Sequence, residues 1–205
     1  MKNLSNENVI HVNKDGVEYL HFRKLLEYKD RLQHCYTLKN LDFRNKQKDD
    51  DDYKKICSAL NLDYKNVIRP QQTHTSVVEV VNEYSDSSDF VEVDGLITNK
   101  KSKVLSLVFA DCTSFFLYDP VKNVIGDIHS GWKGTVKKIG EEAIKRMISE
   151  FCCNPKDIIC CIGPTIRNCH FQVEDDVKEL FENAFHDNSI IKKDKIIDGK
   201  QKYYI

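Results

Sequence analysis

The middle of the chain is dominated by three short stretches rich in β-branched and aromatic residues: Val104 to Phe109, Phe115 to Tyr118 and Val124 to Ile128. Such stretches are typical of β-strands, and Asp119-Pro-Val-Lys-Asn is a turn between the last two. We therefore predict that they form the central sheet. Strands and helices elsewhere intermingle without a regular βαβ alternation, which favours an α+β fold with mixed sheets over a doubly wound parallel fold.

Further elements are predicted on both sides of this sheet. We expect strands at Val17 to Phe22, Cys35 to Leu38, Val67 to Arg69, Val77 to Val81, Ile158 to Ile162 and Tyr203 to Ile205. The strand Ile158 to Ile162 is expected to be buried and to end at Gly163-Pro164, because proline cannot donate to a ladder. We expect helices from Lys46 to Leu60, from Thr135 to Phe151 and from Val177 to Ala184.

Composition restricts the class of protein. The 205 residues suit one domain over residues 1–205, and 40% hydrophobic with 31% charged residues is ordinary for a globular chain. Basic side chains number 31 and acidic ones 32, so the formal net charge is −1. No excess of positive charge is available to neutralise a phosphate backbone, and we expect no nucleic acid partner.

The same residues argue against a membrane or secreted protein. The longest apolar stretch, Val104 to Ala110, is far too short to cross a bilayer, and the N-terminus lacks the apolar segment of a secretory signal. We expect a cytoplasmic monomer or homodimer without a membrane partner, whose eight cysteines stay reduced. Some of these thiols are then available as metal ligands or nucleophiles.

Three residues at predicted strand ends have the chemistry of a metal site: His74, Cys112 and His129. Two imidazoles and a thiolate bind zinc, and three protein ligands leave a fourth position for water or substrate, as in catalytic zinc sites. Water on such an ion ionises near pH 7. The three are far apart in the chain and form no local metal motif, so a buried apolar cysteine and hydrogen-bonded loop histidines remain the alternative.

His129 is followed by Ser130-Gly-Trp-Lys-Gly134, a turn that leads from a strand into a helix. Backbone N–H groups at a helix start attract anions, glycines allow close approach, and Lys133 adds a positive charge. We therefore expect Gly131, Lys133 and Gly134 to bind phosphate. The alternative is a tight turn with Trp132 packed in the core, since two glycines three residues apart are weaker than a full phosphate-loop signature.

Six motifs together are more specific than any one of them. They are Gln72-Thr-His74, Val93-Asp-Gly-Leu96, Ala110-Asp-Cys112, His129-Ser-Gly-Trp-Lys-Gly134, Ile162-Gly-Pro-Thr and Cys169-His-Phe-Gln-Val173. In order and spacing, from Gln33 to Ala184, they resemble the YfiH-like family, also called the multicopper polyphenol oxidase or laccase-domain family. The resemblance implies a layered α/β/β/α fold and zinc bound by His74, Cys112 and His129.

Members of that family are described as purine nucleoside phosphorylases. The resemblance therefore implies that phosphate cleaves adenosine, inosine, guanosine or methylthioadenosine to free base and (methylthio)ribose 1-phosphate, with adenosine deamination as a second activity. Purine nucleoside and phosphate are then the partners. We expect Cys112, His129 and Asp111 to be catalytic, Asp111 by orienting a ligand, and Gln72 to contact substrate.

The chain departs from the family's pattern at several positions. Lys133 stands where arginine is usual, which keeps the charge but loses the planar fork for paired phosphate contacts. Gln172 occupies a position where glutamate is common, and Thr37 to Arg44 lacks the usual Thr-Arg and glycine pair. The chain ends at Ile205, where relatives continue, so we expect a domain shortened at its C-terminus.

Three other functions fit the same residues. A polyphenol oxidase would hold copper in place of zinc, but the seven histidines include no His-x-His pair, and Met1 and Met147 are the only candidates for a blue-copper axial ligand. A metal-free hydrolase of cell-wall precursors would use Cys112 as nucleophile and His129 as base. A non-catalytic module would use the metal for stability alone.

Overall fold

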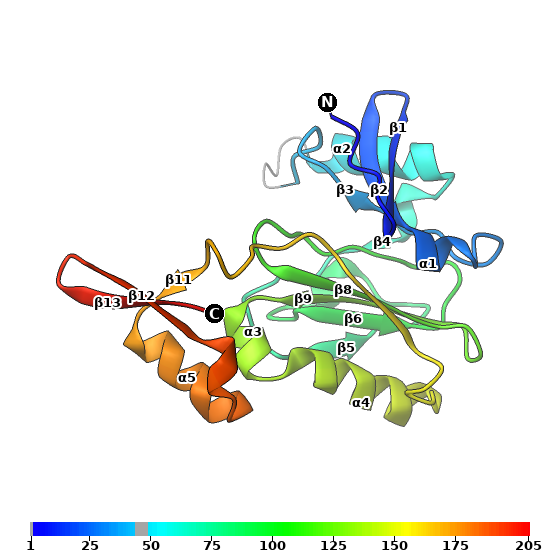
Figure 1. The fold of residues 1–205 in the computed structure, drawn as a ribbon. Coiled ribbons are helices and arrows are strands. Elements are labelled where there is room, and N and C mark those ends of the chain that lie inside the picture. The colour runs from blue at the N-terminus through cyan, green and yellow to red at the C-terminus, as the bar shows by residue number, and fades with distance from the viewer. Residues whose placement is uncertain (1, 44–48) are drawn as a thin grey trace.

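The computed structural model of the chain describes residues 2–43 and 49–205, and Figure 1 shows them as stacked layers of sheets and helices. The helices are α1 (Arg23–Leu26), α2 (Asp49–Leu60), α3 (Trp132–Val136), α4 (Ile139–Phe151) and α5 (Asp175–Phe185). The strands are β1 (Val9–Lys14), β2 (Val17–Phe22), β3 (Tyr36–Thr37), β4 (Val67–Ile68), β5 (Val78–Val80), β6 (Gly95–Thr98), β7 (Val104–Leu105), β8 (Thr113–Asp119), β9 (Val124–Ser130), β10 (Ile159–Ile162), β11 (Gln172–Val173), β12 (Lys192–Ile197) and β13 (Lys200–Tyr204).

The largest sheet is mixed, as predicted. Its five strands lie in the order β10-β8-β9-β6-β5, and neighbours run antiparallel except β5 and β6, which are parallel. The predicted strands β8 and β9 form a hairpin whose register runs from Thr113 opposite Ser130 to Asp119 opposite Val124. This register places the start of β8 beside the end of β9.

The prediction of a central-sheet strand over residues 104–109 is wrong. Only the first two residues form a strand, β7, and it pairs in parallel with β4 in a separate sheet. Beyond β7, side chains bind the backbone: Leu107 N donates to Asp127 Oδ2 at 3.1 Å. Val108 N donates to Gln72 Oε1 at 2.7 Å. Because side chains replace the partners of a ladder, the apolar pattern of this segment does not produce a strand.

Alternate side chains of β8 face two different layers. Phe115 and Leu117 pack in the cluster that includes residues of α4, whereas Phe116 and Tyr118 pack on the opposite face with Phe22 of β2. The rings of Phe22 and Phe116 lie 5.0 Å apart. The five-stranded sheet is therefore covered by α4 on one face and by the β1-β2-β3 sheet on the other.

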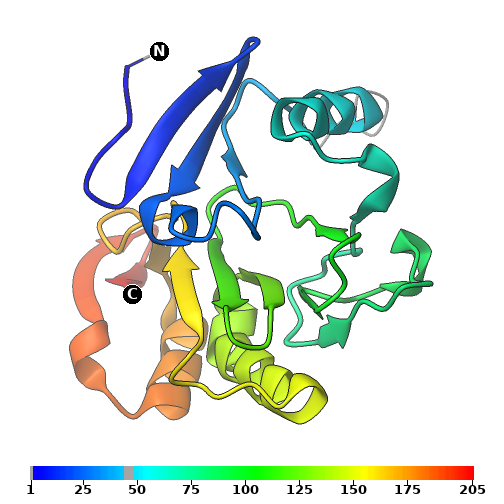
Figure 2. The same cartoon turned by 90° about the vertical axis from the view of Figure 1, so that its right-hand side faces the viewer.

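The β1-β2-β3 sheet is covered in turn by α2. Val17 and Tyr19 of β2 share a core cluster with Tyr53 of α2. This helix begins at Asp49 in the acidic run, as predicted, while the expected start at Lys46 lies outside the described residues. Figures 1 and 2 show α4 on one side of the five-stranded sheet and the three-stranded sheet, together with α2, on the other side. The α+β class and the α/β/β/α layering are confirmed.

Two more predicted elements differ in the structure. The helix expected over residues 135–151 is divided into α3 and α4, because Lys138 between them has a left-handed backbone with φ of 58°. The strand β10 is not buried: it is an edge strand, and Ile162 is 60% exposed. The strands β1, β6, β11 and β12 were not predicted, since their runs are short or mostly polar.

A separate sheet, β11-β13-β12, lies beside α5 on the left of Figure 1 and contains the predicted C-terminal strand. Gln172 belongs to this sheet, and its Nε2 donates to the hydroxyl of Tyr204 at 3.1 Å. All eight cysteines are free thiols. In the described parts of the chain, no helix combines the length and the apolar character that spanning a membrane requires.

A cavity of about 1020 Å³ lies between the two facing sheets. Its lining residues come from the chain between α1 and α2, which includes β3, from α2, from the chain around β7, and from β8 and β9. Tyr36, Phe109 and the buried Asp127 are among them. The ring of Phe109 also lies 5.6 Å from that of His129, so one wall of the cavity reaches the candidate site described below.

The burial of His34 predicts a loss of stability in mild acid. Its Nε2 accepts a hydrogen bond from Phe22 N at 2.8 Å, which requires an unprotonated nitrogen. Burial, and then the charge of the neighbouring His21, lowers the pKa of His34 to about 4. The unfolded chain, in which a histidine has a pKa of about 6.5, therefore binds a proton between pH 6.5 and pH 4 that the folded chain excludes. The free energy of unfolding should fall by about 2 kcal/mol between pH 7 and pH 5 from this residue.

Denaturant titration at the two pH values measures that fall. The variant His34→Gln keeps an acceptor for Phe22 N and cannot titrate, so its free energy of unfolding should depend less on pH than that of the unaltered chain, by about 2 kcal/mol. An equal pH dependence in both proteins would show that His34 is not the group responsible.

Candidate functional site

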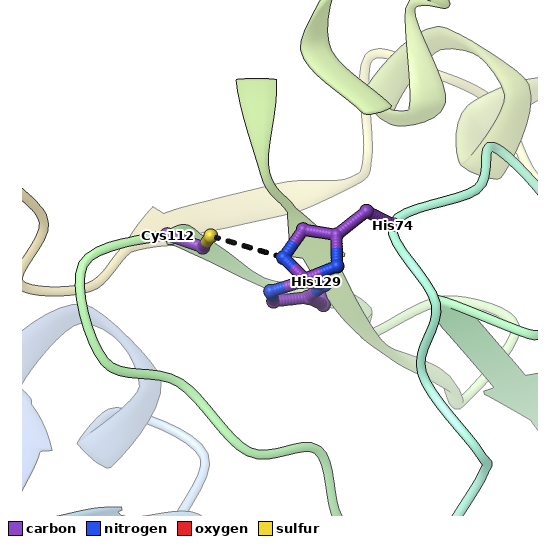
Figure 3. Close-up of side chains that lie close together, drawn as sticks. All are labelled: His74, Cys112 and His129. Carbon is purple, nitrogen blue, oxygen red and sulfur yellow. Dashed lines mark hydrogen bonds between the residues drawn. The ribbon is translucent and has the colours of Figure 1, made fainter. Parts of the chain in front are cut away.

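Three side chains from distant parts of the chain meet at one point. The ligand atoms of His74, Cys112 and His129 lie within 4.8 Å of one another. Figure 3 shows the sulfur of Cys112 facing the ring of His74, with Sγ 3.8 Å from Nε2. The two imidazole rings cross with their centroids 4.9 Å apart. The structure thus brings together the residues that the sequence analysis selected as metal ligands.

The five-stranded sheet positions two of these side chains. His129 is the next-to-last residue of β9, is 4% exposed and lies opposite Ser114 of β8. Cys112 directly precedes β8, whose first residue, Thr113, pairs with Ser130. The strand that follows Cys112, β8, therefore positions this residue. The sequence analysis had placed it at the end of a preceding strand instead. The hairpin register fixes Cys112 beside His129.

His74 comes from the loop between β4 and β5, where its backbone is left-handed with φ of 62°. That conformation costs a non-glycine residue about 1–3 kcal/mol, so surrounding contacts must hold it. The carboxylate of Asp94 provides such contacts. It accepts hydrogen bonds from the backbone N of Thr73 at 3.2 Å, of His74 at 3.1 Å and of Thr75 at 2.7 Å.

The same carboxylate binds His129. Asp94 is fully buried, and its Oδ1 lies 2.7 Å from His129 Nδ1. Burial acts to raise the pKa of Asp94, but the hydrogen bonds from His129 and Thr75 outweigh it and lower the pKa to about 2. Burial also opposes the imidazolium, yet the bonds to Asp94 and Cys112 raise the pKa of His129 to about 9. With Nδ1 bound to Asp94, Nε2 is the ring nitrogen left for other contacts.

The sequence analysis did not select Asp94, and it expected Asp111 to orient a ligand. Asp111 is exposed, and among the described residues its carboxylate has no hydrogen-bond partner. The signal for Asp94 was its place in Val93-Asp-Gly-Leu96, at the entry to the fully buried strand β6. A buried aspartate almost always has a partner, so a predicted buried position would have marked Asp94 as a candidate for a hydrogen bond to a site residue.

Gly131 and Gly134 lie where α3 packs against the His74 loop. A Cβ atom on Gly131 would lie 2.5 Å from His74 Cδ2 and 3.2 Å from Cys112 Sγ, which leaves no room for a side chain. A Cβ atom on Gly134 would approach the carbonyl oxygen of Thr75 to 3.0 Å. Close packing alone therefore requires glycine at position 131 and favours it at position 134.

The other two residues expected to bind substrate differ in their contacts. Lys133 is exposed, with Nζ 5.5 Å from the ring centroid of Trp132, which is half-buried. Gln72 uses both ends of its amide on the backbone of Val108: Nε2 donates to the carbonyl oxygen at 3.0 Å, and Oε1 accepts from N at 2.7 Å. Gln72 thus ties the loop after β4 to the segment that leads to β8. Lys133, in contrast, has an exposed charged group that can meet a ligand.

The donor set fits a zinc ion. Zinc binds imidazole nitrogen at about 2.0–2.1 Å and thiolate sulfur at about 2.3 Å, so two donors of a tetrahedral ion lie roughly 3.3–3.7 Å apart. The 3.8 Å from His74 Nε2 to Cys112 Sγ is close to this value. No fourth histidine, cysteine or carboxylate of the described chain joins the group. Three protein donors with one position free is the arrangement of catalytic zinc sites.

Solved structures share this fold. A Bacillus licheniformis protein described as hypothetical protein YfiH matches with a TM-score of 0.73 and 22% sequence identity, over 98% of this chain and 78% of its own. YlmD from Geobacillus stearothermophilus matches with a TM-score of 0.67 and 22% identity, over 78% of this chain and 61% of its own. At these identities the similarity establishes the fold alone.

Relatives in sequence carry enzyme names. Purine nucleoside phosphorylase YlmD of Bacillus subtilis is 38% identical over 131 residues, which are 60% of this chain and 47% of that protein, so the match spans about half of its length. A purine nucleoside phosphorylase of Clostridium acetobutylicum is 33% identical over 84% of this chain and 73% of its own. Adenosine deaminase RL5, from an unknown prokaryotic organism, is 30% identical over 66% of this chain and 55% of its own.

A family model described as multi-copper polyphenol oxidoreductase laccase matches residues 33–205. The matched region contains every motif that the sequence analysis used and all three residues of the cluster. The resemblance predicted from those motifs is thereby confirmed, and the chain belongs to this laccase-like family of YfiH and YlmD proteins.

Proposed function

We propose that the chain catalyses the phosphorolysis of purine nucleosides at a zinc ion held by His74, Cys112 and His129. The observation that carries the proposal is the cluster of three donors, which no fourth described histidine, cysteine or carboxylate joins, in a chain whose relatives are named purine nucleoside phosphorylases. A zinc ion bound there would supply Lewis acidity, which polarises a substrate oxygen or acidifies a water molecule. The substrates we propose are adenosine, inosine, guanosine and methylthioadenosine.

Lys133 is the residue to which we assign phosphate binding. Its exposed ammonium follows Gly131 by two residues, and Gly131 packs directly against His74 and Cys112. The first N–H groups of α3 have no partner within the helix and favour an anion as well. Phosphate held at this turn would attack C1′ of the nucleoside. The bond from C1′ to N9 breaks as the new C–O bond forms, and its electron pair leaves with the purine.

We assign the purine to the aromatic rings beside the cluster. The centroid of the Phe109 ring lies 5.6 Å from that of His129. The ring of Tyr36 stacks on the ring of Phe109, with an angle of 28° between the planes and 6.1 Å between the centroids. Both rings line the cavity between the sheets. Stacking on an aromatic face accepts any base, because every base has a π-face. This agrees with a range of purine nucleosides as substrates.

Adenosine deamination is a second candidate activity, supported by the relative named adenosine deaminase. It replaces the 6-amino group with an oxygen atom from water and releases ammonia, so its products differ from those of phosphorolysis. The family description favours a third candidate, copper-dependent oxidation of phenols. Measuring the bound metal distinguishes a zinc enzyme from a copper enzyme. It also distinguishes both from a metal-free hydrolase in which His129 activates the Cys112 thiol.

Phosphate-dependent cleavage is the direct test of the proposed function. The zinc-loaded chain should release free base and ribose 1-phosphate from adenosine or inosine only when phosphate is present. His74→Ala and Cys112→Ala should lower the rate more than about 100-fold, since each removes one of three metal donors. Chromatography of base, sugar phosphate and inosine measures the outcome. Base release that is independent of phosphate, or activity that survives metal removal, would contradict the proposal.

The packing at Gly131 gives a test of the cluster itself. Gly131→Ala should push the ring of His74 out of the cluster and weaken zinc binding at least about 10-fold. Gly140→Ala is the matched control, because its Cβ would meet no atom nearer than 3.5 Å, and it should leave zinc affinity unchanged. Competition with a chromophoric chelator measures both affinities. Equal affinity in the two variants would mean that His74 does not bind the ion.

The assignment of Lys133 predicts a defect specific to phosphate. Lys133→Ala should raise the KM for phosphate about 10-fold, the effect of losing one charge-assisted hydrogen bond, with little change in the KM for nucleoside. Lys133→Arg should retain the phosphate KM, and Lys137→Ala, at the exposed C-cap position that follows the same short helix, serves as control. Initial rates over a range of phosphate concentrations measure the effect. Equal phosphate KM values for the two alanine variants would refute the assignment.

A further inference from the structure

We propose that Asp94 is the positioning residue of the metal cluster: its carboxylate fixes the tautomer of His129 and, at the same time, the backbone that presents His74. This inference rests on the proposed role of the cluster as a metal site. Asp94 is not a ligand in it, and its contribution acts through the two histidines. No motif in the sequence assigned it a function.

The two oxygens of the carboxylate have different partners. Oδ1 lies 2.7 Å from His129 Nδ1 and accepts from His74 N at 3.1 Å, so one atom touches both ligand residues. Oδ2 accepts from Thr73 N at 3.2 Å, from Thr75 N at 2.7 Å and from Thr75 Oγ1 at 2.9 Å. The side chain therefore joins the His74 loop to the end of β9.

The main chain of Asp94 makes the same connection a second time. Its carbonyl oxygen accepts from His129 N at 2.7 Å, and its own N donates to the carbonyl oxygen of Val77, just beyond the His74 loop. Because Asp94 is fully buried, water cannot reach its carboxylate, and the side-chain and backbone donors of the His74 loop and His129 must satisfy it. The position of Asp94 is thus fixed relative to both histidines before any ion arrives.

A carboxylate at Oδ1 determines which nitrogen of His129 carries the proton. An ionised aspartate only accepts hydrogen bonds, so Nδ1 keeps its proton, and Nε2 is the nitrogen that offers its lone pair when an ion binds. Metal-binding histidines usually donate their second N–H in this way, and the contact orients the ring and raises its basicity as a ligand. Asp94 thereby presents the correct nitrogen of His129 to the ion.

The substitution Asp94→Asn separates this role from simple packing. The amide keeps the size of the carboxylate, and its oxygen should occupy the Oδ2 position, where three donors converge. Its NH₂ group then takes the Oδ1 position, where it faces Nδ1 of His129 as a donor and no longer accepts from His74 N. Nδ1 must become an acceptor, and the proton moves to Nε2, where the metal has to bind.

Zinc affinity of the Asp94→Asn variant is the first measurement, by chelator competition. We expect a loss of about 10- to 100-fold, the range for a removed partner of a metal-bound histidine. Asp127→Asn is the control: Asp127 is also a buried carboxylate, in the middle of β9, but it accepts its hydrogen bond from Leu107 N. This control should bind zinc within about twofold of the unaltered chain. Equal affinity of all three proteins overturns the proposal.

A second measurement needs no variant and decides the question if Asp94→Asn fails to fold. Long-range ¹H–¹⁵N NMR of the zinc-loaded unaltered chain should show a protonated Nδ1 and a metal-shifted Nε2 on His129. Zinc bound through Nδ1 would overturn the role of Asp94. An unaltered chain that binds no zinc overturns both proposals. A chain that binds zinc but cleaves no nucleoside overturns the proposed function, while the comparison of affinities still tests Asp94.

Discussion

Taking a carboxylate out of water is costly unless hydrogen bonds replace those that water made, and at Asp94 the replacements come from two different parts of the chain. The loop after β4 supplies backbone N–H groups, and β9 supplies an imidazole. The loop makes four of the five contacts, and the imidazole makes the fifth across to β9. The hydrogen bonds that the buried Asp94 carboxylate requires therefore hold together the segments that carry His74 and His129.

The remaining features of the site depend on that connection. The hairpin of β8 and β9 brings Cys112 to the end of β9, and the absence of a side chain at Gly131 lets α3 approach both Cys112 and His74. Gln72 fastens the same loop to the backbone of Val108. The cluster is thus supported from the sheet, from the helix and from the loop.

Sequence patterns were informative where local structure follows from periodicity. The hairpin of β8 and β9, the helix α5 and most of α4 have regular apolar spacing, and each was found. The early end of β7 at Leu105 was not predicted. The backbone N–H groups of Leu107 and Val108 donate to the side chains of Asp127 and Gln72, which lie far away in the sequence. Asp94 was missed for the same reason: its partners are brought near only by tertiary structure. The three candidate ligand residues, which the structure brings together, were selected through chemistry and motif order, not through local spacing.

The ligand residues lie 38 and 17 positions apart and belong to three separate segments, so the cluster does not exist in the unfolded chain. An ion that binds only the folded form adds to its stability in proportion to the logarithm of its concentration, about 4 kcal/mol when free metal exceeds the dissociation constant 1,000-fold. If the proposed zinc ion binds at this cluster, scarcity of zinc would reduce stability as well as the proposed activity. It would shift molecules towards the unfolded form that proteases recognise, and the amount of the protein in a cell would then follow the supply of zinc.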